Sequence, residues 1–362
     1  MIEKSYRFEE TLFSLVHTLG AMNIAQYMAL VAEEYYNKKD PIGRRGSFIT
    51  APEISQMFGE MIGVWCAHTW SQMKDNHDLL LVEFGPGKGT MMSDILRATK
   101  HIPGFHDSIS IHMVEKSASL TKAQQANLKD FHPRIQWHAS LQSLPAKPAI
   151  FISNEFFDAL PIHQFIKSDK GWREHLVAVH PNHERSLAFA LSPSSTPSCT
   201  FIPSDHQQAP EGSVYEFCPA AVSIIQHISK HLLEHGGAAL TIDYGYTTPT
   251  YKGTLQAVNH HEKQHVLLFP GDADITAHVD FSQLTQTAKS LGMRTYPTID
   301  QGTFLHNLGI QYRLEILQKQ TNDKQKESLQ SEYQRLTSPS EMGELFKVFA
   351  FSDVSQKPLA GF

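Results

Sequence analysis

The chain has little of what stabilises small secreted proteins or anchors proteins in membranes. Its 362 residues include only three cysteines, Cys66, Cys199 and Cys218, which lie far apart and form no C-x-x-C pair. This scarcity excludes a disulfide framework and favours reduced thiols in a cytosol-like compartment. No run approaches 18 apolar residues, so no membrane-spanning helix is expected. The first twenty residues lack a signal-peptide pattern, so we expect a cytoplasmic protein; a mitochondrial location would require prior removal of a transit peptide.

A block of positive charge is also missing. The net charge is −6, and the lysines and arginines form no cluster, so a nucleic-acid partner is not expected. The 21 histidines are scattered along the chain. Even His260, His261 and His265 lack the helical H-x-x-x-H spacing or the cysteine partners of a zinc site. We therefore predict that the protein holds no metal.

What is present is an ordinary globular composition with regular alternation of strands and helices. Apolar residues make up 41% of the chain and charged residues 19%, and the length suffices for one large domain or two smaller ones. Periodicity predicts helices at 6–36, 50–73, 117–129 and 219–235, and strands at 79–84, 109–115, 134–137, 149–153 and 237–243. The expected fold is a Rossmann-like α/β domain with a mainly parallel sheet, helices on both faces, and ligands beyond the carboxyl ends of the strands.

Some regions depart from this alternation. Residues 162–217 read as a β-rich insertion, with a turn at 169–171 and a flexible tip at 192–197. Residues 318–336 are polar and predict a solvated helix, and 345–351 predict a last apolar strand. A loop is expected at 37–48, and the polar segment at 75–78 marks a boundary. We therefore predict two domains, a helical extension or lid at 1–76 and a catalytic domain at 77–362.

The most informative motif is V-E-F-G-P-G-K-G-T at residues 82–90. A strand ends at Glu83, and glycines follow at 85, 87 and 89 before a helical pattern begins. Such glycines allow the backbone to turn sharply and to approach a ligand closely, while the N-terminus of the helix favours an anionic or strongly polar group. The motif therefore predicts a cradle for a nucleotide-like cofactor.

The sequence does not match two common cofactor-binding motifs of this kind. A dinucleotide fingerprint requires glycine or alanine where Thr90 stands, and a phosphate-binding loop requires serine or threonine after Lys88. The spacing E-x-G-x-G-x-G resembles instead the first motif of class I S-adenosylmethionine-dependent methyltransferases. A glycine-rich turn that only links a strand to a helix remains the alternative.

Carboxylates follow the next strands. Glu115 ends the strand after the glycine turn, where an acidic side chain can accept both hydroxyls of a ribose. The alternative is a surface charge at the start of a helix. In N-E-F-F-D-A-L-P at 154–161, Glu155 and Asp158 lie three residues apart and could hold a guanidinium by bidentate hydrogen bonds. The alternative is that Asn154 caps a helix and the two carboxylates interact with its dipole.

Two more polar positions lie at expected strand ends. Asp243 and Tyr244 end the fifth strand, and His278 lies in T-A-H-V-D-F at 276–281. His278 could orient a substrate or relay a proton. It could equally be a satisfied polar residue beneath a loop.

Six motifs occurring together and in order identify a closer resemblance. They lie at 48–60, 82–90, 153–161, 242–245, 276–281 and 341–347. Together they resemble the MidA-like family, relatives of the mitochondrial complex I assembly factor that methylates arginine. The resemblance covers nearly the whole chain. It implies a class I methyltransferase fold and S-adenosyl-L-methionine as methyl donor. In the mitochondrial relatives the acceptor is an arginine of a complex I subunit, which is dimethylated symmetrically.

The resemblance also implies roles for individual residues. The cofactor would be bound by Glu83, Gly85, Pro86, Gly87, Gly89, Thr90 and Glu115. Asn154, Glu155 and Asp158 would face the methyl acceptor, and we add His278 as a further catalytic candidate from its position in the sequence. A substrate wall or lid would include Thr50, Pro52, Ser55, Gln56, Asp243 and Tyr244. Two positions depart from the family pattern: Ser47 and Ala139 stand where relatives usually have aspartate, which removes a loop charge and weakens an adenine contact, respectively.

We therefore expect a methyltransferase whose partner is a protein substrate such as a complex I subunit, and which can form a homodimer. Two alternatives from other classes stay open at this point. One is a small-molecule methyltransferase on the same fold, because a fold does not determine the acceptor. The other is a non-enzymatic assembly chaperone that retains the cofactor site. An oxidoreductase is disfavoured by the glycine spacing.

Overall fold

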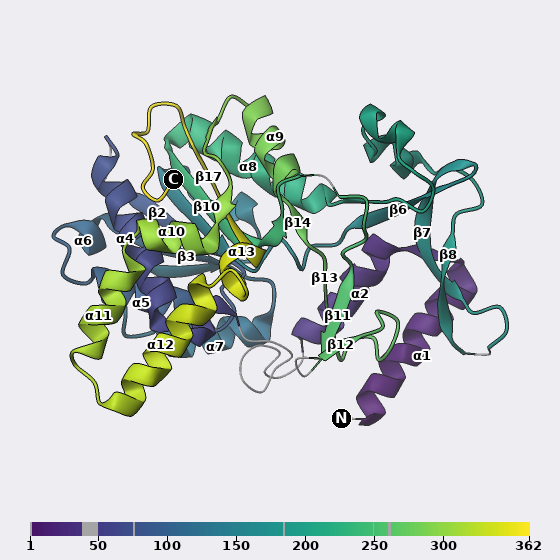
Figure 1. Ribbon diagram of the computed structural model, residues 1–362, viewed down its shortest axis with the longest axis horizontal. Helices are drawn as coiled ribbons and strands as arrows, with labels where there is room; N and C mark the ends of the chain where they lie inside the picture. The colour runs from purple at the N-terminus through teal and green to yellow at the C-terminus, as the bar shows by residue number, and fades with distance from the viewer. Residues whose placement is uncertain (1, 38–49, 75–76, 184, 249, 260–261) are drawn as a thin grey trace. The chain divides into compact units, whose positions relative to one another are not determined.

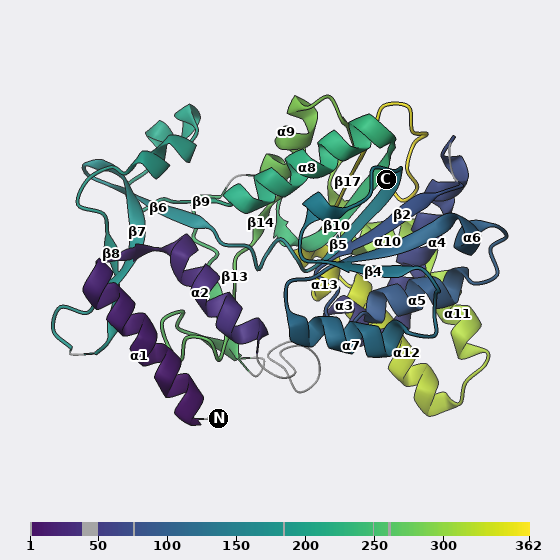
Figure 2. The same cartoon turned by 180° about the vertical axis from the view of Figure 1, so that it is seen from behind.

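The computed structural model describes residues 2–37, 50–74, 77–183, 185–248, 250–259 and 262–362. The chain forms two compact units (Figures 1 and 2). The smaller unit comprises residues 1–48, 157–222 and 248–278, and the larger unit comprises 49–156, 223–247 and 279–362. The loop predicted at 37–48 lies outside the described residues except for Asn37, as do Ser47, residues 75 and 76 of the predicted boundary, and the pair at 260–261.

The larger unit is built around one mixed sheet. Its strand order is β15 (Arg294–Thr295), β17 (Phe346–Ser352), β10 (Gly237–Tyr246), β5 (Ala149–Asn154), β2 (Leu79–Phe84), β3 (Ile109–Val114) and β4 (Ile135–His138). The short strands β14 (Val279–Asp280) and β16 (Ile299–Asp300) pair with β10 and β17. From β10 to β4 every pairing is parallel, and β17 runs antiparallel to β10. The five parallel strands are those predicted from the sequence, and each agrees within a few residues.

Helices cover both faces of this sheet (Figures 1 and 2). One face carries α4 (Gln56–Gln72), α5 (Thr90–Thr99) and α7 (Ala118–Leu128), and the other carries α8 (Pro219–His235) and α9 (Phe281–Ser290). Alternate strand residues explain the two layers: Leu79 and Leu81 pack in one core with Trp65 of α4, whereas Phe151 meets His231 of α8 edge-on. The remaining helices of this unit are α3 (Ala51–Ile54), α6 (Phe105–Ser108), η1 (Leu141–Ser143), α10 (Gln301–Asn307), α11 (Ile310–Gln318), α12 (Asp323–Thr337) and α13 (Met342–Leu345).

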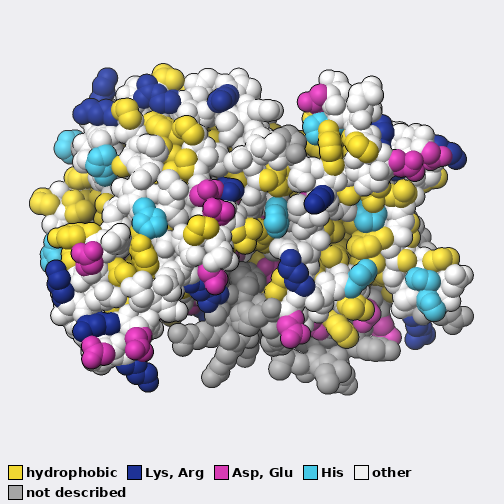
Figure 3. Space-filling model, in the orientation of Figure 1, with side chains coloured by type: hydrophobic (Ala, Val, Ile, Leu, Met, Phe, Trp, Pro, Cys, Tyr) yellow, Lys and Arg dark blue, Asp and Glu magenta, His cyan; other side chains and the backbone are white. Residues whose placement is uncertain are grey.

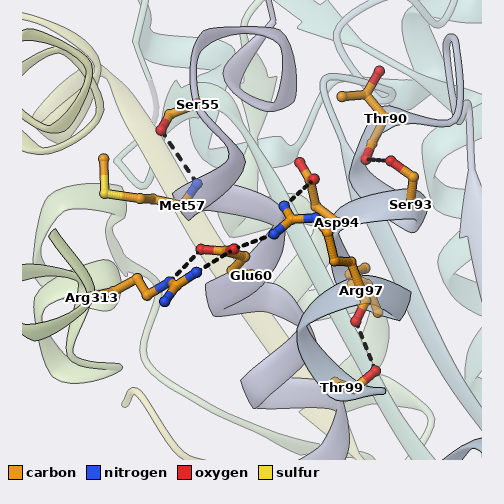
Figure 4. A network of polar contacts seen from close by, with 10 residues as sticks. Ser55, Met57, Glu60, Thr90, Ser93, Asp94, Arg97, Thr99 and Arg313 are labelled. Atoms are coloured by element: carbon orange, nitrogen blue, oxygen red, sulfur yellow. Dashed lines mark hydrogen bonds and ion pairs between the residues drawn. The ribbon is translucent and has the colours of Figure 1, made fainter. Parts of the chain in front are cut away.

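A buried carboxylate joins three of these helices (Figure 4). Glu60 of α4 is only 2% exposed, and it accepts hydrogen bonds from Arg97 of α5 at 2.7 Å and from Arg313 of α11 at 2.7 and 2.8 Å. Arg97 also donates to Asp94 at 2.6 Å. Helices α4 and α5 approach closely beside this network, because a Cβ at Gly59 would lie 2.6 Å from the Cβ of Asp94.

In the part of the chain that the structure describes, the smaller unit is built mainly from two helices and two antiparallel sheets. Its helices are α1 (Ile2–Leu19) and α2 (Ile24–Tyr36), with 3-10 turns η2 (Pro197–Phe201) and η3 (Ser204–Gln208). One sheet has the order β1 (Met22–Asn23), β7 (Gly171–Val179), β6 (His163–Ser168) and β9 (Val214–Phe217), with β8 (Leu187–Leu191) also paired to β7. The other has the order β12 (Glu262–Gln264), β11 (Gln256–Asn259) and β13 (Asp274–Thr276). The predicted β-rich insertion and its turn before Gly171 are therefore present.

The predicted helix at 6–36 is wrong as a single element. The chain ends α1 at Leu19, passes through Gly20 at φ 91° and begins α2 after Asn23, which forms a reciprocal capping box with Gln26. The predicted helix at 50–73 is also two helices, because Ser55 is extended and caps α4. Both interruptions occur at a residue type that favours helix ends.

Other expectations need smaller changes. The segment at 192–197, predicted to be a flexible tip, is held by hydrogen bonds: Ser192 Oγ accepts from the Glu174 N–H at 3.0 Å, and Thr196 donates to the Glu174 carboxylate at 2.7 Å. The polar stretch at 318–336 is helical only from Asp323, after α11 ends at Gln318. Within the described residues, no helix is both long and apolar enough to cross a bilayer.

Candidate functional site

The glycine turn joins β2 to α5 at the carboxyl edge of the parallel sheet. Gly85, Gly87 and Gly89 have φ values of 56°, 55° and 81°, a conformation that side chains with a Cβ rarely adopt. The turn closes on Pro86, whose carbonyl accepts from the Gly89 N–H at 2.8 Å. A Cβ at Gly85 would lie 2.8 Å from the ring of Phe156. The turn therefore requires glycine for both conformation and space.

Glu83 lies on β2 just before this turn and is 2% exposed. Burial raises the pKa of its carboxyl group well above the ordinary value. Among the residues that the structure describes, none hydrogen-bonds its Oε2 atom. A buried carboxyl oxygen without a protein partner is costly to leave unsatisfied, so this position is suited to a polar or cationic ligand group.

Glu115 follows β3, and its carboxylate is held by its own chain. Oε1 accepts from the Ser117 N–H at 2.7 Å, and Oε2 accepts from the amide of Gln124 at 3.3 Å. Burial raises the pKa of Glu115, and these hydrogen bonds oppose the rise. Gln124 also donates to the Gly87 carbonyl at 2.8 Å and accepts from the Trp137 indole at 3.0 Å. Neither Gln124 nor its partner Trp137 on β4 was predicted from the sequence as a site residue.

Glu155 follows β5 with an unusual backbone. Its φ is 48°, a left-handed conformation that is uncommon for a residue with a side chain. Its Oε1 accepts from the Ala51 N–H at 2.9 Å and from the Asn154 amide at 3.1 Å. Asn154 is 8% exposed, and its Oδ1 has no hydrogen-bond partner within the described part of the chain. Residues 155–160 form bends and a turn, so the alternative that Asn154 caps a helix is wrong.

Asp243 supports the same loop from the neighbouring strand. It is fully buried on β10, and its Oδ2 accepts from the Phe156 N–H at 3.1 Å, while its Oδ1 accepts from the Tyr244 N–H at 3.0 Å. The ring of Tyr244 packs edge-on against Phe346. Asp243 thus fixes the backbone immediately after Glu155.

The predicted wall residues lie around α3 and the start of α4. Pro52 occupies the first turn of α3, and Thr50 precedes that helix. Ser55 is buried, and its hydroxyl accepts from the Met57 N–H at 3.3 Å as the cap of α4, which begins at Gln56 (Figure 4). Glu53 of α3, which the sequence analysis did not single out as a site residue, accepts a short hydrogen bond from the hydroxyl of Thr90 at the start of α5. Helix α3 is therefore tied both to the glycine turn and, through the Ala51 N–H, to Glu155.

Two predicted residues, Asp158 and His278, belong to the smaller unit. The Asp158 carbonyl accepts from the Ala277 N–H at 3.0 Å, and the His278 N–H donates to Thr254 at 2.9 Å. Burial and the nearby charge of Lys263 lower the pKa of His278.

Beside Asp158 lies an acidic residue that the sequence analysis did not identify. Asp274 is 3% exposed and accepts from the Tyr36 hydroxyl at 3.0 Å. Burial first, and the charge of Asp158 second, raise its pKa to about 7. Its position three residues after Gly271 resembles an ordinary turn, so the sequence carried no signal for it.

Within the described ranges, no group of three or more histidine, cysteine or acidic side chains is arranged to hold a metal ion. The donor set instead fits an organic cofactor. A glycine turn, a buried carboxyl oxygen with no hydrogen-bond partner among the described residues, and a strand-end carboxylate follow one another along the sheet edge. These features suit the polar ends and the ribose of S-adenosyl-L-methionine. Fold and site together define a class I methyltransferase.

The comparisons with known proteins agree with that class. Residues 61–299 match the family model described as "Putative S-adenosyl-L-methionine-dependent methyltransferase". The mitochondrial protein arginine methyltransferase NDUFAF7 of Mus musculus is 37% identical, over 92% of this chain and 82% of its own length, and that of Homo sapiens is 36% identical, over 92% and 81%. The chain belongs to this family of S-adenosyl-L-methionine-dependent methyltransferases, so the predicted MidA-like resemblance is confirmed.

A solved structure supports the same conclusion. A Burkholderia thailandensis protein crystallised with S-adenosyl-homocysteine has a TM-score of 0.85 and 26% identity, covering 99% of this chain and 95% of its own. The predicted fold class, enzyme class and methyl donor are thereby confirmed.

Proposed function

We propose that this protein transfers a methyl group from S-adenosyl-L-methionine to a guanidinium nitrogen of an arginine in a partner protein. Curated relatives at 32–37% identity carry the name of a protein arginine methyltransferase, which supports an arginine acceptor here. The observation that carries the proposal is the Glu155 carboxylate, presented in a left-handed backbone conformation at a strand end. Such conformations persist only where the surrounding structure imposes them, and they cluster at functional sites.

The carboxylate of Glu155 is suited to a guanidinium. Arginine presents a planar fork of N–H donors that matches a carboxylate, and it keeps its proton in water. The Ala51 N–H and the Asn154 amide fix the orientation of the Glu155 carboxylate. Asp243 holds the backbone that follows. A preorganised carboxylate of this kind can align one guanidinium nitrogen for attack.

The methyl donor supplies an electrophilic methyl group on a sulfonium when it is bound. We assign its binding to Glu83, Gly85, Pro86, Gly87, Gly89, Thr90 and Glu115, and the wall around it to Thr50, Pro52, Ser55, Gln56, Asp243 and Tyr244. Glu155 would accept hydrogen bonds from the guanidinium and concentrate its positive charge on the nitrogens that it touches. Lone-pair density would then be available on the attacked nitrogen. As its bond to the methyl carbon forms, the carbon–sulfur bond breaks to leave S-adenosyl-homocysteine, and the nitrogen releases one proton to solvent.

Asp158 and His278 are the remaining proposed acceptor residues. His278 stays a proposed residue that orients the substrate or relays a proton, as the sequence predicts. The support for Asp158 is the family resemblance.

For the partner, we propose a subunit of respiratory complex I, as the family resemblance implies, and a homodimer as the assembly. The compartment proposed from the chain is the cytosol, which its three free cysteines suit. The curated relatives are named as mitochondrial proteins.

A charge-only substitution tests the role of Glu155. In Glu155→Gln the amide oxygen can still accept from the Ala51 N–H, so the loop is preserved while the charge is lost. We expect transfer to fall by about a hundredfold or more, with binding of S-adenosyl-homocysteine unchanged in calorimetry. Glu155→Ala removes the acceptor as well and should also lower the melting temperature. If Glu155→Gln lost transfer and cofactor binding equally, the assignment to the acceptor would be wrong.

A further inference from the structure

Gln124 is a fully buried amide on α7, where it is buried together with Leu120 and Leu128, although glutamine is mostly exposed in proteins. Its side chain meets three groups that come from three other elements. The amide nitrogen donates to the Gly87 carbonyl at 2.8 Å and to Glu115 Oε2 at 3.3 Å, and the amide oxygen accepts from the Trp137 indole at 3.0 Å. Both ends of the amide are therefore used.

These partners allow only one orientation of the amide. The indole N–H of Trp137 can only donate, so it requires the oxygen of Gln124 on its side. The Gly87 carbonyl can only accept, so it requires the nitrogen. Neither glutamate nor an apolar residue of the same length can satisfy both. The chemistry of the site therefore selects glutamine at this position.

We propose that Gln124 is a positioning residue that joins the glycine turn to the carboxylate of Glu115, so that recognition of the ribose hydroxyls depends on it. This inference rests on the proposed role of Glu115 as the ribose ligand. The second amide N–H of Gln124 holds Glu115 Oε2, and the Ser117 N–H holds Oε1, so the carboxylate is fixed at both oxygens. The same amide fixes the carbonyl of the central glycine of the turn.

A neighbouring residue provides a matched control. Asn127 is exposed on the same helix, and its amide donates to the Lys88 carbonyl at 2.9 Å. It therefore supports the next carbonyl of the glycine turn, and within the described part of the chain it makes no hydrogen bond to Glu115. Loss of Asn127 should weaken the turn alone, whereas loss of Gln124 should also release the carboxylate.

The experiment compares binding of S-adenosyl-homocysteine and of its 2′,3′-dideoxy analogue by calorimetry. In the wild type, removal of the hydroxyls should weaken binding by about tenfold or more, as expected for hydrogen bonds to a charged group. In Gln124→Met, S-adenosyl-homocysteine should bind about tenfold more weakly and the dideoxy penalty should shrink to about threefold or less. Asn127→Met should keep the full penalty. Trp137→Phe keeps Gln124 but removes the indole N–H that orients its amide, so this variant should give an intermediate penalty. It replaces Gln124→Met in the test if Gln124→Met does not fold.

Each outcome is decisive. If the dideoxy penalty stayed at its full size in both Gln124→Met and Trp137→Phe, the positioning role of Gln124 would be overturned, while the ribose role of Glu115 would stand. The same would follow if the penalty shrank equally in Asn127→Met and Gln124→Met. Absence of a penalty in the wild type would overturn the ribose role of Glu115 and this inference with it, while leaving arginine methylation unaffected. The pH profile gives a further readout. Loss of the Gln124 hydrogen bond should raise the pKa of Glu115 further. As pH is lowered, Glu115 of Gln124→Met should therefore take up a proton, and binding of S-adenosyl-homocysteine should weaken, at a higher pH than in the wild type.

Discussion

At the scale of single residues, unusual backbone conformations lie at the ends of the parallel strands. Gly85, Gly87 and Gly89 follow β2, and Glu155 follows β5. A non-glycine residue in such a conformation costs on the order of 1–3 kcal/mol, and that cost must be offset by the surrounding structure. Here the Ala51, Asn154 and Asp243 contacts provide that support.

The first prediction concerns Gly85. In Gly85→Ala the new Cβ would combine a left-handed backbone with a contact of 2.8 Å to the Phe156 ring. We expect a loss of stability of about 1–2 kcal/mol from the backbone alone and a loss of S-adenosyl-homocysteine binding, measured by thermal melting and calorimetry. Gly292→Ala is the control, because Gly292 also has a positive φ but open space around it. Both variants should melt earlier, but retention of binding by Gly85→Ala would contradict the prediction.

The sequence predicted some site residues and not others for a physical reason. Glu83 and Glu115 lie at the ends of apolar strands, where an apolar run gives way to an acidic residue. Their place at the ends of strands could therefore be predicted from the sequence. Gln124 lies within a helical pattern, and the amino-acid sequence alone does not distinguish a buried amide side chain from a solvated one. Its burial depends on Trp137 and Gly87, which are distant in the chain.

At the scale of elements, the ion network around Glu60 joins α4, α5 and α11 (Figure 4). Glu60→Ala would leave Arg97 and Arg313 without this partner, and we expect a loss of about 2–4 kcal/mol in urea unfolding. The lower end reflects solvation of the arginines, whose side chains are 41% and 29% exposed. Asp78→Ala removes an exposed pair with Lys147 and should change stability by less than about 1 kcal/mol. Equal effects of the two substitutions would show that the network does not stabilise the helix layer.

A third prediction concerns α2 and β13, which meet through Tyr36 and Asp274. The pKa of Asp274 is about 7 in the fold against an ordinary 3.8. Between these pH values the folded state holds a proton that the unfolded chain has released, so stability falls as pH rises from about 4 to about 7. A difference of this size corresponds to at most about 4 kcal/mol.

The substitution Asp274→Asn tests this pH dependence. It removes the titrating group and keeps an oxygen that can accept from Tyr36. Urea unfolding between pH 4 and 7 should show a smaller decline in stability for Asp274→Asn than for the wild type. An unchanged slope in Asp274→Asn would contradict the account.

Helix boundaries were the least predictable elements. Apolar periodicity continues from Leu12 to Val31 through the break, so it predicted one helix. The actual signals were local, namely Gly20 in a left-handed conformation and the Asn23–Gln26 capping box. By contrast, α8 and β2 have the predicted bounds, because each is flanked by residues that end its pattern.

At the scale of the whole molecule, the alternation of strands and helices was sufficient to predict the parallel sheet of the larger unit. It was not sufficient for the smaller unit, which assembles three separate segments of the chain. Its pairing of β1 with β7, for example, joins residues about 150 positions apart. Such pairings depend on tertiary packing, which local periodicity does not encode. The division into a helical extension or lid at 1–76 and a catalytic domain at 77–362 stays a prediction.

The central claim is that this protein methylates arginine in a partner protein through the site around Glu155. The most direct test is mass spectrometry of proteins that co-purify with the wild type and with Glu155→Gln, expressed in cells of the source organism. We predict one partner that carries one or two additional methyl groups on an arginine with the wild type and none with Glu155→Gln. The same partner, equally methylated or equally unmethylated with both forms while the cofactor binds both, would contradict the claim.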